Sequence, residues 1–508
     1  MVFLGMKGGE PVNENDLKTA DRDYPTASGE DIVCLTMQWE TINWRKVYGH
    51  VNRMKTRIAK ASLNSQTENV RRLQRLLVNS LDARLAAVKA VTTNKGRRTA
   101  GVDGVLWNTS AQKMRAALTL DPKEYKAKPL KRVYIEKKGK KGKKRPLSIP
   151  TMRDRAMQTL FAEALSPVAE AGGDRHSYGF RKGRSAQDAY AQIVVNLSHK
   201  NSAEWVLEGD IKGCFDNIDH EWLLRNIPMD KGMLRQFLKA GYMHQGLLHD
   251  AANGTPQGGI ISPILANMAL DGIDGLLDKK YHTNHSGGHR VNYVRYADDF
   301  IVTARTEEMA WEIKGMLAEF MSERGLELSS EKTLVTRVDE GFDFLGWTFR
   351  KFRGKLVPMP SKASVKRFLG EVKQVVKKVG PAVTQDELIA ILNPKIRGFA
   401  NYHKNACSSR TFGYIDNRIY RLLVGWAKRK HGKKNAKWRH KRYWRSQGGR
   451  NYIFGTEERT LLLMSWQHIV RRSPLACEKN PYIDPEYFDK RAYEHRRKAR
   501  NSFRPAAP

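Results

Sequence analysis

Two adjacent aspartates near the middle of the chain lie between two segments that have the composition of β-strands. Residues 291–296 and 300–303 are rich in β-branched and aromatic residues, which favours strands. The pattern predicts a β-hairpin whose tip carries Asp298 and Asp299 into a cleft, because Asp tolerates turn geometry. An isolated Asp-Asp pair is more often only a polar turn. A catalytic interpretation therefore requires a third carboxylate, cations that bind phosphate and a surface for nucleic acid.

A third carboxylate follows another predicted strand. Residues 205–207 have the pattern of a strand that ends at Asp210, whereas Asp216 and Asp219 suit cap and turn positions. Three carboxylates in one place repel one another unless cations intervene, and Mg²⁺ prefers such oxygen ligands. Two ions about 4 Å apart stabilise the attacking and leaving oxygens of an in-line displacement. The three aspartates therefore predict nucleotidyl transfer with two Mg²⁺ ions, or Mn²⁺ in their place.

Cations that could hold a triphosphate lie in a second predicted hairpin. Residues 133–135 and 147–149 are short apolar strands around a tip of glycine and cationic residues. Lys137 and Arg145 are the candidates, because Lys binds phosphate as a point charge and Arg as a bidentate fork. Gln257 lies in a Pro-Gln-Gly-Gly loop, where glycine lets the backbone approach a ligand closely.

The net charge favours a polyanionic partner. The 508 residues include 90 Lys and Arg against 53 Asp and Glu, which gives a net charge of +37. Such a field attracts nucleic acid, with an anionic membrane surface as the weaker alternative. No apolar run reaches about 18 residues, so we expect no transmembrane helix, and the N-terminus lacks the order of a signal peptide. The four scattered cysteines form no CxxC pair, which fits a reducing, cytoplasmic setting.

Two basic segments interleave cations with aromatic residues, a composition that suits phosphate contacts beside base stacking. The candidates for nucleic-acid contact in the loop 175–185 are Arg175, Arg181, Lys182 and Arg184. The candidates in the segment 428–445 are Lys428, Arg429, Lys430 and Arg439, beside the aromatic residues Trp438, Tyr443 and Trp444. The N-terminal helices are also basic, and either a solvated face or an RNA-facing arm would explain their charge.

The chain as a whole predicts an α+β fold in five parts. These are a mobile N-terminal tail (1–36), a basic helical extension (37–128), alternating strands and helices (129–355), a helical domain (356–427), and a basic segment whose tail is loosely ordered from Lys490 (428–508). Periodicity predicts a single helix over 70–85 and another over 264–277, one strand over 342–349, a strand-turn-strand unit over 326–335, and a capping box at residues 185–188.

The order of the motifs resembles that of reverse transcriptases. The motifs are Lys-Arg-Pro-Leu-Ser-Ile-Pro at 144–150, Asp210 with Phe215, Thr-Pro-Gln-Gly-Gly at 255–259, Tyr-Ala-Asp-Asp at 296–299 and Phe-Leu-Gly-Trp at 344–347. A later run, Asn-Pro-Lys-Ile-Arg-Gly-Phe-Ala-Asn-Tyr-His at 393–403, makes the chain similar to bacterial group II intron-encoded proteins, the reverse transcriptase–maturases. The resemblance covers roughly residues 39–490.

This resemblance implies a right-hand polymerase with fingers and palm, a helical thumb that is the maturase or X domain, and a DNA-binding segment. Asp210, Asp298 and Asp299 would be the catalytic metal ligands, together with Ile211. Phe215 would pack where a ribonucleotide 2′-hydroxyl would lie, and so would favour deoxynucleotides. The residues implied to line the nucleotide site are Lys137, Arg145, Ile211, Phe215, Gln257 and Lys332.

The implied partners are a group II intron RNA, target DNA and deoxynucleoside triphosphates, with no membrane. The thumb, including Arg397, and the N-terminal helices would grip the RNA and assist its splicing and reverse splicing. Copying of that RNA into cDNA would complete retrohoming in the bacterial cytoplasm or nucleoid.

One departure from the family pattern concerns the end of the chain. Many members end in a Cys/His-rich endonuclease domain, whereas Cys477 is the single cysteine in the last hundred residues here. We therefore expect no cleavage of target DNA by this chain, and a primer from another source. The alternatives are a reverse transcriptase of host defence or a CRISPR system, and a splicing-only RNA-binding maturase. The maturase-like region at 361–445 argues against the first, and the three aspartates argue against the second.

Overall fold

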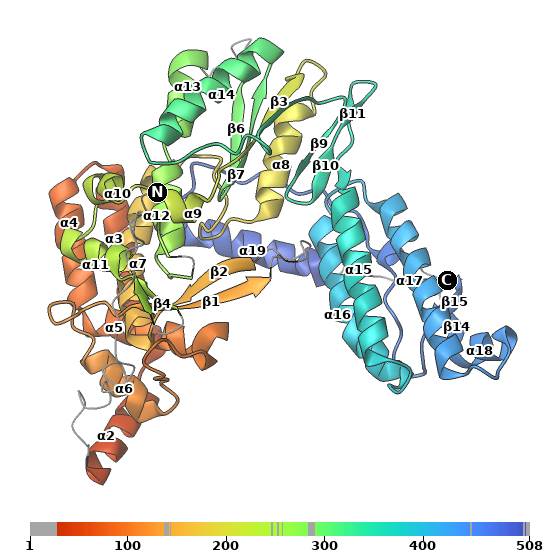
Figure 1. Cartoon of the computed structure of the whole chain (residues 1–508), viewed down its shortest axis with the longest axis horizontal. Coiled ribbons are helices and arrows are strands. Elements are labelled where there is room, and N and C mark those ends of the chain that lie inside the picture. The colour runs from red at the N-terminus through yellow and green to blue at the C-terminus, as the bar shows by residue number, and fades with distance from the viewer. Residues whose placement is uncertain are drawn as a thin grey trace, which may run out of the picture.

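The structure is a computed structural model that describes residues 28–136, 142, 144–244, 247–250, 253–256, 258–282, 290–447, 450–500 and 503. Figure 1 shows a group of N-terminal helices, a central region that contains two sheets, and a group of C-terminal helices to one side. Strands and helices alternate along the central region, which confirms the α+β class. No helix in these ranges is long and apolar enough to cross a membrane.

The N-terminal helices pack around a long central helix, α7 (Met152–Gly172). Their bounds are α2 (Gly29–Glu40), α3 (Trp44–Leu63), α4 (Thr67–Asn79), α5 (Leu81–Thr93) and α6 (Ser110–Leu118), with a short 3-10 helix η2 (Lys95–Arg98). α3, α4 and α5 contact α7 directly. Val47, Val51 and Ile58 lie on one face of α3 and are buried there, as their helical spacing predicts.

The N-terminal tail was predicted to extend too far. α2 begins at Gly29, so residues 29–36 are helical, while residues 1–27 lie outside the described part of the chain. A capping box between Ser28 and Asp31 starts the helix, and α2 packs against α6.

The single helix expected over 70–85 is two helices. Ser80 has an extended conformation at the end of α4, and its hydroxyl accepts a hydrogen bond from the backbone N–H of Ala83 in α5. Ser80 ends one helix and caps the next. The helical conformation is therefore interrupted there although the apolar spacing continues.

The predicted basic hairpin belongs to a four-stranded sheet with the order β2-β1-β4-β5. Its strands are β1 (Leu130–Glu136), β2 (Lys144–Ile149), β4 (Tyr242–His244) and β5 (Leu247–His249). β1 pairs antiparallel with β2 and parallel with β4. The hairpin is confirmed, and Lys137 at its tip lies outside the described residues.

The Asp-Asp hairpin lies in a second four-stranded sheet with the order β6-β7-β3-β8. The strands are β3 (Trp205–Asp210), β6 (Asn292–Tyr296), β7 (Asp299–Ala304) and β8 (Leu334–Arg337). The helix α14 (Glu307–Ser322) contacts β3, β7 and β8, and α8 (Ala186–Leu197) contacts β6. Three shorter helices follow β3, namely α9 (Cys214–Asn217), α10 (His220–Asn226) and α11 (Lys231–Lys239). The first strand expected over 326–335 is only an isolated bridge between Leu328 and Ile211.

The helix expected over 264–277 is broken into α12 (Ser262–Leu270) and α13 (Ile273–Tyr281). Asp271 is extended between the two helices, and Gly272 has a φ of 108°. The break lets the Asp271 carboxylate form an ion pair with Arg295 of β6. A partner distant in the sequence therefore overrides the local helical pattern.

The strand expected over 342–349 is a tight hairpin of β9 (Phe342–Phe344) and β10 (Trp347–Phe349). Leu345 and Gly346 form the turn with φ values of 49° and 86°. β10 also pairs with β13 (Met359–Pro360), and β11 (Lys351–Phe352) pairs with β12 (Lys355–Leu356). Both β9 and β10 keep the apolar alternation, so the pattern alone did not distinguish one strand from two.

The C-terminal helices form a separate hydrophobic core. Their bounds are α15 (Lys362–Val379), α16 (Gln385–His403), α17 (Ser409–Lys430) and α18 (Ala436–Tyr443), followed by β14 (Trp444–Gln447), β15 (Arg450–Phe454) and the 3-10 helix η3 (Met464–Trp466). The expected boundary at residue 427 cuts through α17. Tyr443, Trp444 and Phe454 are buried in the same core as α15 and α16, so the domain continues beyond that boundary.

The end of the chain is more ordered than predicted. Residues 485–500 form the helix α19 (Pro485–Arg500) rather than a loose tail from Lys490. Phe488 of α19 packs in a core with Tyr178 and Ala189 of the central region. This contact fixes α19 against the central region.

The capping box expected at the start of α8 does not form. The Ser185 hydroxyl donates instead to the Asp188 carboxylate, at 2.7 Å. Arg472 and Arg491 also donate to this buried carboxylate. Asp188 therefore anchors the C-terminal segment rather than the first turn of its own helix.

Candidate active site and nucleic-acid surfaces

The structure brings the three predicted aspartates to one end of the central sheet. β3 pairs antiparallel with β7, and the last residue of β3, Asp210, is directly opposite the first residue of β7, Asp299. Residues directly opposite on antiparallel strands point to the same face. Asp298 lies in the tight turn between β6 and β7, after Ala297 with a φ of 58°. The predicted hairpin is therefore confirmed, and a separate strand supplies the third carboxylate.

The electrostatics of this site are those of crowded like charges. The pKa of Asp299 is raised to about 6 by desolvation and by the charges of Asp298 and Asp210, against the opposing effect of Lys332. Desolvation is also the main cause that raises the pKa of Asp298, to which Asp210 adds. Both directions are those expected when carboxylates share a site without enough positive charge.

Lys332 supplies part of the missing charge. It lies in the turn before β8, and its Nζ is 2.7 Å from Oδ2 of Asp210. The hydrogen bond to Asp210 raises the pKa of Lys332. The turn position was predicted, and the structure identifies Asp210 as the partner.

The donor set has the chemistry of a site for a hard divalent cation, because carboxylate oxygens are the ligands that Mg²⁺ prefers. Positive charge added at the site would stabilise the ionised carboxylates of Asp298 and Asp299, and so lower their raised pKa values. In the part of the chain that the structure describes, no three His, Cys, Asp or Glu side chains are arranged to hold a metal ion as they stand. Asp210 engages Lys332 instead.

A buried network that sequence reasoning missed supports the Asp-Asp hairpin. The side chain of Arg295 in β6 is 0% exposed, donates to the Asn267 side chain at 2.9 Å, and forms an ion pair with Asp271. Burial raises the pKa of Asp271 to about 7, and the Arg295 charge opposes this rise. The signal in the sequence was an arginine within an otherwise apolar strand, since a buried cation requires a partner.

The loop after α7 also holds the hairpin. The backbone of Tyr178 donates to the carbonyl of Arg295 at 2.9 Å. A Cβ on Gly179 would lie 2.2 Å from the backbone nitrogen of Ala297. Only glycine therefore fits between this loop and the turn that carries Asp298.

The candidate nucleotide side of the site is described in part. The Arg145 charge lowers the pKa of Asp298, so this residue of β2 lies close enough to act on that carboxylate. Phe215 is half-buried, and its ring meets that of Phe180 edge-on with centroids 6.4 Å apart. Ile211 is buried next to Asp210. Lys137 and Gln257 lie outside the described residues.

The glycine-rich loop near Gln257 approaches protein backbone. A Cβ on Gly258, whose φ is 118°, would lie 2.2 Å from the carbonyl oxygen of Ser148 in β2. The backbone N–H of Thr255 donates to the carbonyl of Phe215 at 2.6 Å. The close approach predicted for this loop therefore includes contacts with β2 and α9.

Two predicted nucleic-acid contacts in the loop 175–185 are contradicted by burial. Arg181 and Arg184 each form an ion pair with Glu170 of α7 at 2.8 Å, and the three side chains are 7%, 2% and 5% exposed, respectively. They stabilise the loop and do not face a ligand. Lys182 and Arg175 are exposed, so nucleic-acid contact stays a prediction for them.

The segment 428–445 is corrected in the same way. Lys430 donates to the backbone carbonyls of Pro381 and Val383, and Arg439 donates to those of His431 and Lys434. Tyr443 and Trp444 are buried in the C-terminal core, so neither ring is available for base stacking. The candidates that remain exposed are Lys428, Arg429 and Arg397.

A cavity of 750 Å³ lies between the Asp-Asp hairpin and the C-terminal helices. Asp299 lines it on one side, and Arg367 and Lys395 line it on the other. Trp347 of β10 stacks on Tyr402 of α16 with ring centroids 4.5 Å apart. The cavity therefore adjoins the aspartates and carries cations from the helical domain.

Comparison with known families agrees with this geometry. Residues 135–349 match the family "Reverse transcriptase (RNA-dependent DNA polymerase)", residues 39–120 match "N-terminal domain of reverse transcriptase", and residues 365–444 match "Group II intron, maturase-specific domain". The chain is similar to the group II intron-encoded protein LtrA of Lactococcus lactis subsp. cremoris, with 30% identity over 71% of this chain and 74% of LtrA. The chain belongs to the group II intron-encoded proteins.

One further protein and one solved structure match parts of this chain. Protein YkfC of Escherichia coli (strain K12) is 30% identical over 58% of this chain and 87% of YkfC. A structure of telomerase from Candida albicans in complex with a fragment of telomeric RNA covers 62% of this chain with a TM-score of 0.36 and 12% identity, which is too weak to carry an argument.

As a group II intron-encoded protein, the chain is an RNA-directed DNA polymerase with a right-hand polymerase fold. The sheet with Asp210 and Asp299 and the strand β2 lie in the reverse transcriptase match, and the helices α15 to α17, called the thumb below, overlap the maturase-specific match. The maturase-specific match extends to residue 444, which agrees with a helical core that continues beyond residue 427.

Proposed function

We propose that this protein binds its group II intron RNA, assists splicing and reverse splicing, and copies the RNA into cDNA by two-metal nucleotidyl transfer during retrohoming. The observation that carries the catalytic part is the pairing of Asp210 with Asp299 across β3 and β7, with Asp298 in the adjoining turn. We also propose that it acts in the bacterial cytoplasm, on deoxynucleoside triphosphates and target DNA.

Asp210, Asp298 and Asp299 would hold two Mg²⁺ ions, which would lower the pKa of the attacking 3′-hydroxyl and balance the charge of the triphosphate. Asp299, with a pKa of about 6, is ionised at neutral pH and provides negative charge for that set. Lys332 holds Asp210 at 2.7 Å and orients its carboxylate. Arg145, whose charge acts on Asp298, would contact phosphate.

Phe215 is the proposed selector of deoxynucleotides. Its ring is braced edge-on by Phe180, and the backbone of its helix α9 receives the loop that precedes Gln257. A ring held by packing on one side and by its backbone leaves little space for an added hydroxyl. The prediction is greater incorporation of ribonucleotides by the Phe215→Ala variant.

The proposed RNA partner is supported by charge and by the maturase-specific match at 365–444. The net charge of +37 needs many phosphates to neutralise it. Arg397 and Arg367, which are exposed, and Lys395, which is half-buried in the cavity that Asp299 lines, are suited to contact the phosphate backbone.

Primer extension on an RNA template tests the catalytic proposal. Asp298→Ala is expected to abolish synthesis, whereas affinity for RNA changes less than about twofold, because the substitution removes a carboxylate and no cation. Asp339→Ala is the matched control, since Asp339 is an exposed acid of the same region, paired with Arg337. Absence of template-dependent synthesis by the unmutated protein would overturn the catalytic proposal, and a parallel loss of RNA affinity in Asp298→Ala would contradict the assigned role.

A further inference from the structure

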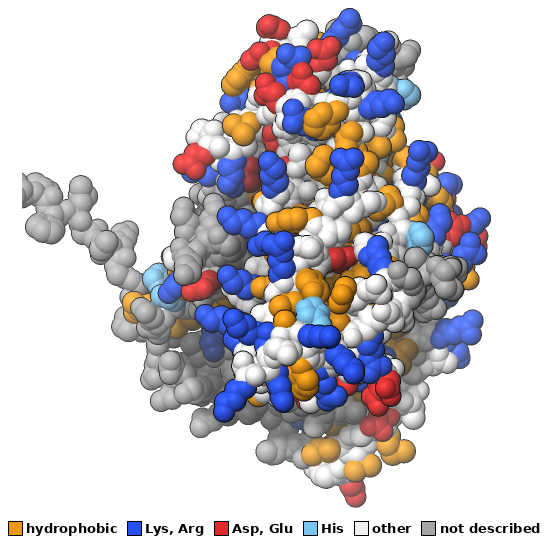
Figure 2. All heavy atoms as spheres, turned by 90° about the vertical axis from the view of Figure 1, so that its right-hand side faces the viewer, with side chains coloured by type: hydrophobic (Ala, Val, Ile, Leu, Met, Phe, Trp, Pro, Cys, Tyr) orange, Lys and Arg blue, Asp and Glu red, His pale blue; other side chains and the backbone are white. Residues whose placement is uncertain are grey.

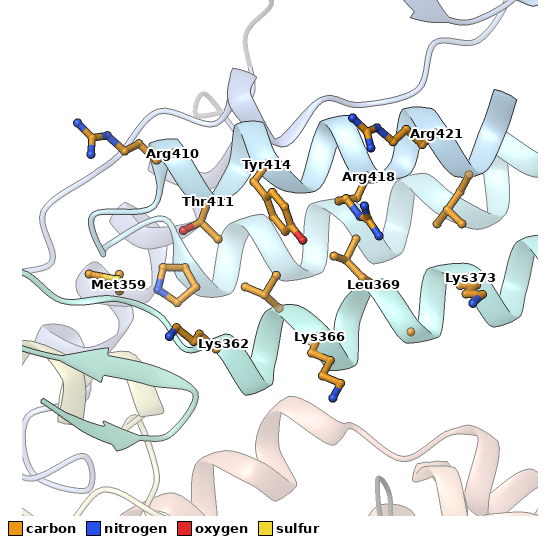
Figure 3. Close-up of a pocket in the computed structure, with 14 residues that line it drawn as sticks. Met359, Lys362, Lys366, Leu369, Lys373, Arg410, Thr411, Tyr414, Arg418 and Arg421 are labelled. Carbon is orange, nitrogen blue, oxygen red and sulfur yellow. The ribbon is translucent and has the colours of Figure 1, made fainter. Parts of the chain in front are cut away.

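A second cavity lies on the thumb between α15 and α17, away from the one that adjoins Asp299. Its volume is 1040 Å³, and its walls are the two helices with the strand β13 at one end. Figure 3 shows two rows of side chains, one from each helix, with Leu369 and Tyr414 between the rows. We call this cavity the thumb groove.

Positive charge lines both sides of the thumb groove. The cations are Lys362, Lys366 and Lys373 from α15, and Arg410, Arg418 and Arg421 from α17. All six are exposed, and within the described residues none of them makes an ion pair. Figure 2 shows that Lys and Arg side chains are spread over the face of the molecule that the C-terminal helices form.

The acidic residues of both helices lie elsewhere. Glu371 of α15 lines the other cavity, beside Arg367. Asp416 of α17 accepts hydrogen bonds from the backbone N–H groups of Met464 and Ser465. The sequence of each helix contains no other Asp or Glu, so the positive field of the groove is not neutralised from its own walls.

The floor of the groove is apolar, and an aromatic side chain projects from it. Val365, Leu369 and Leu422 line the floor, and Tyr414 is 54% exposed. Its ring projects from α17 toward α15 (Figure 3). The hydroxyl of Thr411 lies one turn away on the same helix, so the groove offers an aromatic face and hydroxyl groups as well as charge.

We propose that the thumb groove binds an unpaired segment of RNA, with a base stacked on Tyr414 and phosphates held by the two rows of cations. An RNA duplex presents phosphates and 2′-hydroxyls and hides its base faces, whereas unpaired bases stack on aromatic side chains. A duplex would not bring base faces to the apolar floor or to the exposed Tyr414 ring. The hydroxyls of Thr411 and Tyr414 are suited to a ribose 2′-hydroxyl. This assignment rests on the proposed function, for which RNA is the partner.

A polyanion fits the groove better than a protein partner does. The row from Lys362 to Lys373 spans eleven helical steps, or about 16 Å at the helical rise, and a nucleic-acid strand supplies phosphates at regular intervals over that length. α15 separates this groove from the cavity with Asp299. A strand bound here therefore lies on the other side of α15 from the cavity that Asp299 lines.

The test measures the affinity of the full-length protein for a 15-nucleotide unpaired RNA, a hairpin duplex of equal length and a DNA strand of the unpaired sequence. Tyr414→Ala is expected to weaken binding of the unpaired RNA about tenfold, the usual loss of one stacked base, and to leave duplex binding within twofold. Tyr414→Phe retains the ring and is expected to lose less than threefold. Trp311→Ala is the control, because Trp311 is an exposed aromatic beside a cation on α14.

Equal losses for unpaired and duplex RNA, or no loss in Tyr414→Ala, would overturn the proposal in favour of a charged surface without stacking. DNA binding as strong as RNA binding would overturn the assignment of RNA. Photocrosslinking from p-benzoylphenylalanine at position 414 in ribonucleoprotein should capture RNA, and capture of protein alone would assign the groove to a protein partner. Template-directed synthesis by the unmutated protein tests the proposed function separately, since it does not depend on this groove.

Discussion

The loop 175–184 and the helix α17 are both rich in arginine, but their guanidinium groups have opposite surroundings. Arg181 and Arg184 are buried against Glu170 and hold the loop that supports the Asp-Asp hairpin. Arg418 and Arg421 of α17 are exposed in the thumb groove. The same side chain is therefore structural in one segment and available to a ligand in the other.

The difference lies in the acids that surround each segment. Glu170 supplies both carboxylate oxygens to the loop, one to each arginine. α17 has one acid, Asp416, and backbone N–H groups occupy it. A count of basic residues in a sequence window cannot separate these cases, because the deciding partner lies outside the window.

The largest expected effect comes from breaking the buried pair. Glu170→Gln leaves two buried guanidinium groups opposite a neutral amide, and removal of one partner of a buried ion pair costs about 3–5 kcal/mol. The free energy of unfolding, measured with urea, should fall by that amount. Glu457→Gln, which alters an exposed pair with Arg445 at 3.5 Å, should cost less than about 1 kcal/mol. Equal losses in the two variants would refute the structural role assigned to the loop.

The second prediction concerns what the loop supports. Gly179→Ala would place a Cβ 2.2 Å from the backbone nitrogen of Ala297, so the turn that carries Asp298 must shift. A displacement of about 1 Å in a catalytic group can reduce the rate 100-fold, and kcat for primer extension should fall by about that factor. RNA affinity should change little, because no cation is removed. A variant with normal kcat would show that the loop does not position the hairpin.

Local patterns predicted most of the elements that position the site. Strand composition identified β3 and the β6–β7 hairpin, and the helical regions expected over 37–128 and 356–427 contain α3 and α15. The errors arose where a distant partner overrides the local pattern. The break between α12 and α13 depends on the ion pair of Asp271 with Arg295, and no helical period contains that information.

The candidate site was predicted to a similar extent. The sequence was sufficient to select Asp210, Asp298 and Asp299, because each follows or interrupts a strand, and the structure brings them together. Which basic residues face a ligand was not predictable from composition, as Lys430 and Arg439 illustrate by donating to backbone carbonyls. Aromatic residues near cations can either stack on bases or pack in a core, and the sequence did not distinguish the two. Tyr443 and Trp444 pack in the C-terminal core.

The third prediction compares the exposed and the buried arginines by the salt dependence of RNA affinity. Arg418→Gln should reduce the slope of log affinity against log salt for unpaired RNA by about 0.7, the value for one phosphate contact on a single strand, without altering stability. Arg184→Gln should lower stability and leave the slope unchanged, because that guanidinium is 2% exposed. Fluorescence anisotropy over a KCl series measures the slope. A change of slope in Arg184→Gln would place that residue on the RNA surface after all.

The smallest expected effect concerns an acid, Asp299, whose charge is not fully balanced by partners of opposite charge. The pKa of Asp299 is raised to about 6 in the folded state, against about 3.9 for an unfolded aspartate. Between pH 4 and pH 6 the folded state therefore binds more protons than the unfolded state, so stability falls as pH rises through this window. Asp299→Asn removes the repulsion and should raise the melting temperature by about 1–2 °C at pH 7, with almost no change at pH 4. An equal rise in melting temperature at both pH values would mean that the effect does not come from crowded carboxylates. A rise confined to neutral pH would show that the aspartates carry unbalanced charge that Lys332 alone does not neutralise.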